Sequence, residues 1–445
     1  MFKMKIFAFV FFSLFIWMIA ISGSPTVIAV LDTPVDYSHP EIQAVLEEDL
    51  LKNAQFVDER GEEKSWYDLN LEAKAEFEKR LNQELYAEQI EYLNAMHGST
   101  ESRSQTGKNL KFLIARGTLK YIFSPKYRSS LNIVAKYLHG THVAGIMMKS
   151  LSNVRLISFP LLKISEKMTL SDILNYDPVP QREEMRQQFE QISKILQSNH
   201  VRVVNLSIGT SHALYFKEIR KRATLVHKTV FRKKLRNMSN ESAKIFKEEM
   251  MRFIRANPNS VFVLGAGNDR RDLSKTPDHT ATIEAENLIK VAAVSRSGSI
   301  ARFSNHSPLL VDIAARGTGI SSAMAGGGEI HMSGTSQAVP KVTNALAQIF
   351  ESAPQISVQE AIDMLYEKHT KEKPSLADFV ANGRVLAIDR LSLFPHRSSS
   401  ENFRAEMGDA PLEDLKSLFD KYMDIDGLLP RESSISKNAC HAIFR

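Results

Sequence analysis

Short apolar runs alternate with longer amphipathic stretches along most of this chain. The first run, residues 26–32, consists largely of small and β-branched residues and ends at a carboxylate, which is typical of a buried strand. Amphipathic stretches such as residues 183–199 separate later runs of the same kind. Those runs are NVRLISFPLL (153–162), VRVVNLSIG (201–209), SVFVLGAGN (260–268) and NLIKVAAVS (287–295). Strands that alternate with helices predict a three-layer α/β fold, in which helices cover both faces of a mostly parallel sheet.

Two longer segments are helix-like and strongly charged. Residues 47–91 are acidic and place Phe77, Leu81 and Leu85 four apart, which predicts one apolar stripe on a single charged helix. Residues 217–255 are basic. Three interpretations stay open: both segments are solvated helical faces, they pack against each other, or the basic one faces an anionic surface. The formal charge of +6 over 445 residues is modest, so charge alone does not favour nucleic acid as a partner.

The N-terminus has the layout of a secretory signal peptide. Lys3 and Lys5 precede an apolar run over residues 6–21, and small residues follow at 22–24. An uncleaved membrane anchor is the alternative, but the run is shorter than the ~20 residues that a spanning helix needs. We therefore expect cleavage after Ser22, with a periplasmic or secreted product.

Four short stretches carry residues that suit nucleophilic catalysis by serine. Asp32 ends the first strand, and Asn268 closes a later one in GAGND. His139 stands in HGTHVAGIM just ahead of a predicted helix, and Ser336 lies in SGTSQAVP on a glycine-containing turn at a helix start. A nucleophilic serine needs a base for its proton, an acid that orients the base, and donors for the oxyanion. A helix N-terminus at Ser336 would favour the developing negative charge.

Each of these residues is a weak signal alone. An aspartate after a strand is usually a turn former or cap, a serine in SGTS is usually a helix N-cap, and an asparagine after glycine usually lies in a turn. The two histidines of HGTH are three apart, but no further histidine or cysteine cluster completes a metal site. The order Asp, His, Asn, Ser along one chain favours a joint function.

The motifs around these residues resemble those of the subtilisin-like serine proteases, the subtilases. AVLDTPVDYSHPEI is similar to that family's aspartate motif, HGTHVAGI matches the histidine motif, and GAGND matches the oxyanion-asparagine segment. GTSQAVP is similar to the serine motif, with Gln337 where methionine is most usual. The resemblance covers about residues 26–391, and it implies a subtilisin-like α/β fold that carries helical insertions.

The resemblance also implies a role for each residue in an exported serine endopeptidase. Ser336 would attack the scissile carbonyl, His139 would be the base, and Asp32 would orient it. Asn268 and the Ser336 backbone N–H would hold the oxyanion. Ser207, Ile208 and Gly209 would form the strand edge that pairs with the substrate backbone. Gly265, Ala266 and Gly267 would form one wall of the pocket for the residue before the scissile bond.

The expected partners are polypeptide substrates, and the expected form is a monomer without bound nucleic acid. Association with an anionic envelope surface through the basic insertion is a further interpretation. No cofactor is required by this chemistry, and although the family carries calcium, no calcium site is identified in the sequence. Cys440 is the single cysteine, so the folded chain must rely on its core or on ions rather than on an intrachain disulfide.

The expected organisation is a signal peptide (1–22), a catalytic domain (23–391) and a C-terminal tail with a short amphipathic helix (392–445). Helical insertions near residues 47–130 and 211–258 fall between core strands, where a fold tolerates additions, and would restrict access to the cleft if they lie over it. The family usually carries a pro-domain, for which the sequence leaves no room, so we expect folding either unaided or with help from another segment or chain.

Pro34 is a departure from the family, which favours glycine at this position. Proline fixes φ and cannot donate a hydrogen bond, so a turn that needs either freedom would hold Asp32 poorly. The competing hypothesis is therefore a catalytically weak or inactive scaffold that binds peptides along the cleft. Thr33 still offers a hydroxyl and an N–H beside Asp32, and we expect the carboxylate to be held.

Overall fold

The computed structural model describes residues 25–57, 62–98, 108–161, 169–208, 225–276 and 280–387. The predicted signal peptide, Gly209, and the predicted C-terminal tail with its helix and Cys440 lie outside the described residues. Within the described ranges, no helix combines the length and the apolar character that crossing a membrane requires.

An eight-stranded sheet forms the centre of the molecule, in the order β11-β12-β8-β7-β6-β5-β1-β4. Neighbouring strands run parallel, apart from the antiparallel pair β11 and β12. The predicted strands are confirmed as β1 (Thr26–Asp32), β4 (Val154–Pro160), β5 (Val203–Leu206), β6 (Val261–Gly265) and β7 (Leu288–Val294). Their continuous apolar character reflects burial on both faces of the sheet. Three short strands of this sheet were not predicted, namely β8 (Ile313–Arg316), β11 (Thr370–Glu372) and β12 (Arg384–Leu386).

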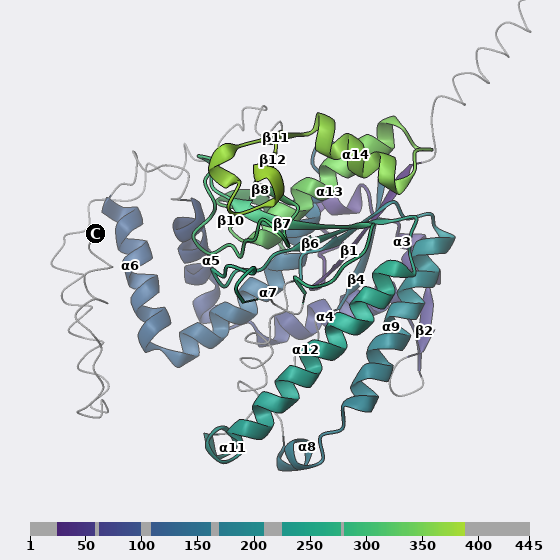
Figure 1. The fold of residues 1–445 in the computed structure, drawn as a ribbon. Coiled ribbons are helices and arrows are strands. Elements are labelled where there is room, and N and C mark those ends of the chain that lie inside the picture. The colour runs from purple at the N-terminus through teal and green to yellow at the C-terminus, as the bar shows by residue number, and fades with distance from the viewer. Residues whose placement is uncertain are drawn as a thin grey trace, which may run out of the picture.

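Helices cover both faces of this sheet (Figure 1). Parallel crossovers are right-handed, so the connection from β1 to β4 and the connection from β4 back to β5 pass over opposite faces. One face carries α7 (Pro125–Met148) and α13 (Thr335–Ser352), which pack against each other, and α14 (Val358–Lys368) packs on α13. The other face carries α9 (Pro178–Ser198) and α12 (Arg232–Arg255). The predicted three-layer α/β fold is therefore confirmed.

The acidic segment folds into several elements rather than one helix. They are α3 (Glu48–Asn53), β2 (Gln55–Val57), β3 (Glu63–Ser65), α4 (Trp66–Arg80) and α5 (Gln83–Gly98), and α6 (Lys108–Phe123) follows this segment. The prediction of one continuous stripe was wrong, because Leu81 is extended (φ −64°, ψ 130°) and ends α4. This break lets α4 pack on β4 while α5 packs on the antiparallel hairpin β9 (Ile320–Ala323) and β10 (Glu329–Met332). Trp66 is fully buried and meets the ring of Phe159 on β4 edge to face.

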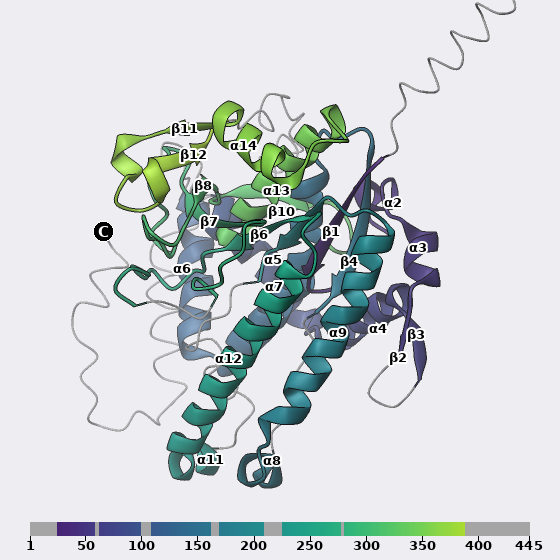
Figure 2. The ribbon, with the colours of Figure 1, turned by 45° about the vertical axis from the view of Figure 1, so that its right-hand side comes forward.

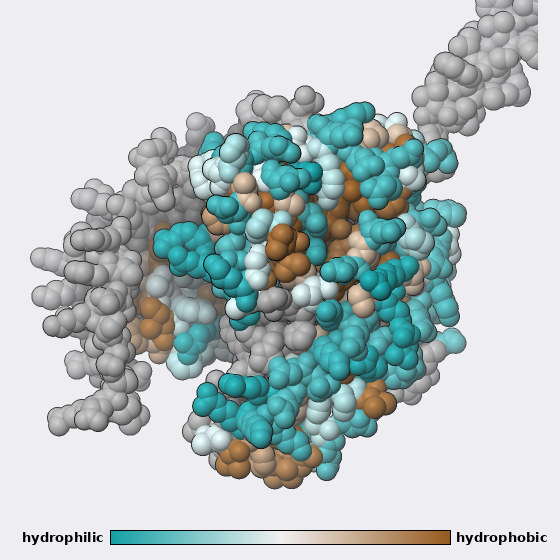
Figure 3. Space-filling view, viewed as in Figure 1, coloured by the Kyte–Doolittle hydropathy of each residue, from teal (hydrophilic) through white to brown (hydrophobic). Residues whose placement is uncertain are grey.

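Among the described residues, the basic segment packs on α9 rather than on the acidic segment. Its helix α12 runs beside α9, and both extend away from the sheet to the short helices α8 (Leu170–Leu174) and α11 (Leu225–Val230), as Figures 1 and 2 show. Buried Glu249 on α12 forms ion pairs with Arg182 and Arg186 on α9. Figure 3 shows a largely hydrophilic surface over this helix pair, with hydrophobic residues at its far end.

Candidate active site

The topology creates a crevice at the carboxyl ends of β1 and β5. These two strands are neighbours, and the chain leaves them in opposite directions, β1 toward β4 and β5 toward β6. Such a reversal of strand order separates the connecting loops and leaves room for a ligand. Asp32 is the last residue of β1, and Ser207 directly follows β5. The fold therefore places both residues at the point where an α/β sheet most readily forms a site.

Asp32 and His139 form a hydrogen-bonded pair in this crevice. The Nδ1–H of His139 donates to Oδ1 of Asp32 at 2.6 Å. The side chain of His139 is 22% exposed, and that of Asp32 is 1% exposed. Burial lowers the pKa of His139, but the charge and hydrogen bond of Asp32 outweigh it, so the pKa lies above the ordinary histidine value. His139 lies well inside α7 and not ahead of a helix as predicted, because the helix already begins at Pro125, capped by Ser124.

The loop after Asp32 holds the carboxylate without help from Pro34. The backbone N–H of Thr33 donates to Asp32 Oδ1 at 2.6 Å, and the Thr33 hydroxyl lies 3.2 Å from the same oxygen. The second carboxylate oxygen, Oδ2, is buried and has no hydrogen-bond partner among the described residues. Pro34 has no N–H to offer it. Glycine at position 34 is therefore not needed to orient Asp32 toward His139.

Gly140 lets this loop sit directly on the histidine helix. Its N–H donates to the Thr33 hydroxyl at 2.8 Å, and a Cβ built on Gly140 would lie 2.2 Å from the Thr33 carbonyl oxygen and 2.8 Å from that of Pro34. Both obstacles are backbone atoms that no side-chain rotation can move. The glycine of the HGTH motif is thus required by the close approach of the loop to α7.

Gly140→Ala should therefore separate Asp32 from His139. Because the methyl group meets backbone, we expect the free energy of unfolding to fall by about 1–3 kcal/mol and the pKa of His139 to fall as its contact with Asp32 weakens. Urea denaturation and an NMR pH titration of His139 would check both. The control is Gly327→Ala, which has no atom within 4 Å of its added Cβ but has φ +104°, so it introduces backbone strain without this clash. An unchanged His139 pKa in Gly140→Ala would contradict the role assigned to this contact.

Ser336 is half-buried as the second residue of α13. Its hydroxyl donates to the backbone carbonyl of Ser207 at 3.0 Å, and the Ser207 hydroxyl donates back to the Ser336 carbonyl at 3.0 Å. Among the described residues no hydrogen bond joins Ser336 to His139. A nucleophilic role would require the Ser336 hydroxyl to leave the Ser207 carbonyl and donate to Nε2 of His139.

Two N–H donors converge beside Ser336. Oδ1 of Asn268 accepts from the backbone N–H of Thr335 at 2.9 Å and lies 3.2 Å from the Thr335 hydroxyl, which leaves Nδ2 as a donor. Both donors lie near one point beside Gly334. The position that a Cβ on Gly334 would take is 3.5 Å from Asn268 Nδ2 and 3.6 Å from the backbone N of Ser336. Asn268 is exposed, so its amide and the Ser336 N–H form a site suited to an oxyanion.

The predicted substrate-binding residues flank this arrangement. Ser207 and Ile208 follow β5, whereas Gly265 ends β6 and is followed by Ala266 and Gly267. Gly267 has φ +100°, and a Cβ there would lie 2.5 Å from the Nδ2 of Asn305, so glycine is required. Gly209 lies outside the described residues.

Asn305 supports the asparagine loop and was not singled out by the sequence. It is fully buried, and its Oδ1 accepts from the backbone N–H groups of Asp269 (3.0 Å) and Arg271 (2.9 Å). Its Nδ2 donates to the carbonyl of Ala266 at 2.9 Å. These partners stand more than 30 positions away, so no local pattern marks this residue.

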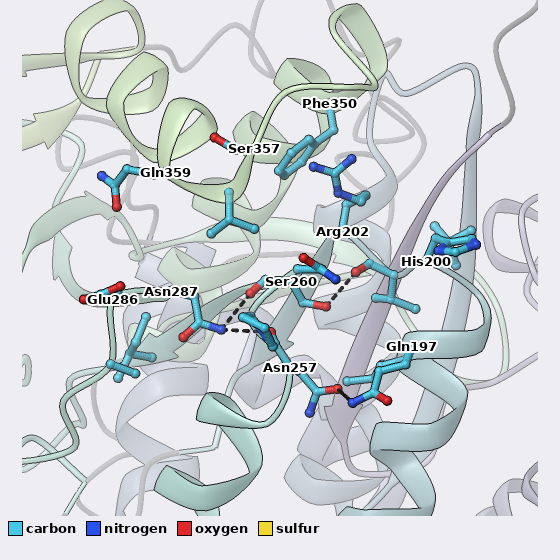
Figure 4. A pocket seen from close by; sticks show the side chains of 18 of the residues that line it. Gln197, His200, Arg202, Asn257, Ser260, Glu286, Asn287, Phe350, Ser357 and Gln359 are labelled. Carbon is cyan, nitrogen blue, oxygen red and sulfur yellow. Dashed lines mark hydrogen bonds between the residues drawn. The ribbon is translucent and has the colours of Figure 1, made fainter.

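A separate pocket of about 1910 Å³ lies at the amino ends of β1, β5 and β6, that is, at the opposite ends of the strands from Asp32 and Ser207 (Figure 4). Two of the polar side chains that line it are engaged within the chain. Arg202 donates to the carbonyls of Pro354 and Ile356, and Asn287 donates to the carbonyl of Ser260. We therefore assign the chemistry to the carboxyl edge, where open parallel sheets generally bind their ligands. In the described ranges, no group of three or more His, Cys, Asp or Glu side chains could hold a metal ion.

Similarity to known proteins is found both among solved structures and at the level of the family. The chain is similar to the A-subunit of an AB5 toxin from E. coli (16% identity, TM-score 0.45, 82% of this chain and 90% of that one). It is also similar to a cold-adapted subtilisin-like serine proteinase (16% identity, TM-score 0.42, 82% of this chain and 89% of that one). A third similar structure is the epidermin leader peptide processing serine protease from Staphylococcus aureus (17% identity, TM-score 0.43, 82% of this chain and 74% of that one). No curated protein sequence matches the chain. The family model of the subtilase family matches residues 23–383, which is most of the chain, and the chain therefore belongs to the subtilase family.

Proposed function

We propose that this subtilase is an active, exported serine endopeptidase. The observation that carries the proposal is the 2.6 Å hydrogen bond between buried Asp32 and His139, at the same edge of the sheet as Ser336. Nucleophilic catalysis needs a buried carboxylate that orients a histidine, and a serine at a helix N-terminus that the histidine can reach when the Ser336 hydroxyl leaves the Ser207 carbonyl.

In the proposed reaction each of these groups has one role. His139 takes the proton of Ser336 as its oxygen attacks the scissile carbonyl, and Asp32 stabilises the positive charge on the imidazole. Asn268 Nδ2 and the Ser336 backbone N–H donate to the oxyanion of the tetrahedral intermediate. His139 then gives its proton to the leaving amine, and a water molecule, activated in the same way, releases the acyl group from Ser336.

Two observations favour the competing hypothesis of a weak or inactive scaffold. The Ser336 hydroxyl donates to the Ser207 carbonyl, and Asp32 Oδ2 has no partner among the described residues. A fluorophosphonate probe distinguishes the two hypotheses, because it labels only an activated serine. We expect labelling of the wild type and none of Ser336→Ala. A folded wild-type protein that takes up no label would leave the scaffold as the better account.

Asn268→Ala should lower kcat for peptide hydrolysis by about 10²- to 10³-fold with a smaller change in KM, because the amide meets the oxyanion and not the ground-state carbonyl. Asn199→Ala is the matched control, since that amide donates to Ile195 at the opposite edge of the sheet. Steady-state kinetics on one peptide would measure both. A change in KM alone would contradict the assignment to the oxyanion site.

We extend the proposal to the cell and the partners. Residues 1–22 would direct export to the periplasm or the medium, and N-terminal sequencing of the mature protein should then begin at Gly23. Polypeptides are the proposed substrates of a monomer that needs no cofactor and binds no nucleic acid. Exposed Arg232 and Lys233 support contact of the basic insertion with an anionic envelope surface, which rising salt should release.

A further inference from the structure

We infer that helix α4, within the insertion, is a brace that positions the catalytic aspartate, and that it acts through Asn70 and Lys74 on the loop of residues 33–36. The inference rests on the proposed peptidase function. It assigns to the insertion a role in forming the active site rather than only in covering it.

Asn70 makes the first contact of this brace. Its Oδ1 accepts from the backbone N–H of Val35 at 2.9 Å, and its Nδ2 donates to the carbonyl of Val35 at 2.8 Å. Asn70 is 0% exposed and Val35 is 1% exposed. One side-chain amide thus satisfies both backbone groups of a buried residue that stands next to Pro34. Without it, these two polar groups would lose the partners that the fold gives them, and a buried polar group left unpaired is destabilising.

Lys74 makes the second contact, one helical turn along α4. Residues four apart lie on the same face of a helix, so Asn70 and Lys74 both face the loop. Lys74 Nζ lies 3.4 Å from Oδ1 of Asp36, whose side chain is 3% exposed, and 2.9 Å from the Glu78 carboxylate. The Asp36 carboxylate also accepts from the backbone N–H of Gly326 at 2.8 Å. This ion pair therefore fixes the far end of the same loop.

The loop of residues 33–36 is bonded to α4 on one side and to α7, the helix that carries His139, on the other. On the α7 side, the Thr33 hydroxyl accepts from the N–H of Gly140, and the N–H of Asp36 donates to the Thr141 hydroxyl at 2.8 Å. Gly140 is the neighbour of His139. A shift of the loop against α7 would therefore change the Asp32–His139 contact directly.

Two further features make α4 suited to this role. Trp66, at its first turn, is fully buried against Phe159 of β4, so the helix is anchored to the sheet that carries Asp32. Pro34 removes one N–H from the loop, and the next N–H along the chain, that of Val35, is the one that Asn70 receives. The insertion thus supplies the loop with an external support.

The test uses the full chain and compares Asn70→Ala with Asn287→Ala. Asn287 is buried too, and its Nδ2 donates to the carbonyls of Ile254, Asn257 and Ser260 at the far edge of the sheet (Figure 4). Both variants lose buried hydrogen bonds and should lose thermal stability. For Asn70→Ala we expect kcat to fall about 10- to 100-fold with KM within about threefold, because a small displacement of a catalytic group is costly. Asn287→Ala should keep the wild-type kcat.

A pH profile separates positioning from stability alone. The pKa of His139 is lowered by burial and raised by the charge and hydrogen bond of Asp32 from β1. His142, on α7 itself, has a pKa lowered to about 3 by burial and stays neutral over this pH range. If the loop shifts, Asp32 stabilises the protonated His139 less, and the acid limb of kcat/KM should move to lower pH in Asn70→Ala but not in Asn287→Ala. Lys74→Met, at a side chain that is 20% exposed, provides a second variant, with an expected loss in kcat of about threefold to tenfold.

The outcomes separate the brace from the peptidase function. If both α4 variants keep the wild-type kcat and acid limb while wild type is labelled by the fluorophosphonate probe, the brace is overturned and the peptidase stands. If folded wild type is neither labelled nor active, the peptidase function fails and the inference fails with it. If Asn70→Ala does not fold, Lys74→Met decides by the same readouts.

Discussion

Ser336→Ala and His139→Ala should each lower kcat for peptide hydrolysis by about 10⁶-fold, and the double variant should be no slower than either single variant. The serine is a poor nucleophile unless His139 takes its proton, so the removal of either partner abolishes the same step. The residual rate would come from the oxyanion donors of Asn268 and the Ser336 backbone, which both substitutions leave in place.

Initial rates on a fluorogenic peptide, with an active-site titration of the wild type, would measure these losses. Ser352→Ala is the matched control, because it lies at the other end of the same helix and donates to the carbonyl of Ile349. It should keep the wild-type rate. A double variant that loses the product of the two single effects would mean that Ser336 and His139 act independently, and the proposed mechanism would then be wrong.

Asp32→Asn should lower kcat by about 10⁴-fold and shift the acid limb of the pH profile to lower pH. The neutral imidazole of His139 is the base, so activity in the wild type is lost as pH falls through the pKa of His139. Asp32 raises this pKa above the ordinary value of about 6.5, against the opposing effect of burial. In the variant the effect of burial remains and favours the neutral ring, so the midpoint should fall below that of the wild type.

The pH dependence of kcat/KM between about pH 5 and 9 would check this second expectation. Asp269→Asn is a suitable control, because that exposed carboxylate lies on the asparagine loop and not at His139. A lower rate with an unchanged acid limb would show that Asp32 orients His139 without stabilising its charged form. An unchanged rate would remove Asp32 from the mechanism.

The central strands of this subtilase were predictable from their local sequence pattern. The runs that form β1, β4, β5, β6 and β7 are apolar on both faces, and a local pattern is enough to mark a strand buried on both sides. The unpredicted strands of this sheet, β8, β11 and β12, have three or four residues each, and each includes a charged and a partly exposed residue. β5 is equally short, but its four residues are uncharged and all buried. Pairing with neighbouring strands therefore decides the conformation of the unpredicted strands.

The helical insertions show the limit of the same reasoning. The spacing of Phe77, Leu81 and Leu85 predicted one helix, yet the chain breaks at Leu81 so that α4 and α5 can bury their apolar faces against different partners. Charge likewise predicted an attraction between the acidic and basic segments as one alternative. Helix α12 instead packs on α9, because burial of its apolar stripe and the Glu249 ion pairs outweigh a general attraction between charged surfaces.

The sequence by itself determined the chemical identity and the order of Asp32, His139, Asn268 and Ser336, because each lies in a short motif whose residues are neighbours along the chain. Only the tertiary structure decided how those groups are held. Asn70 and Asn305 bind backbone atoms more than 30 positions away, and Gly140 is required by the close approach of another segment. Hydrogen bonds and close contacts of this kind depend on distances in space, and a pattern along the chain does not contain those distances.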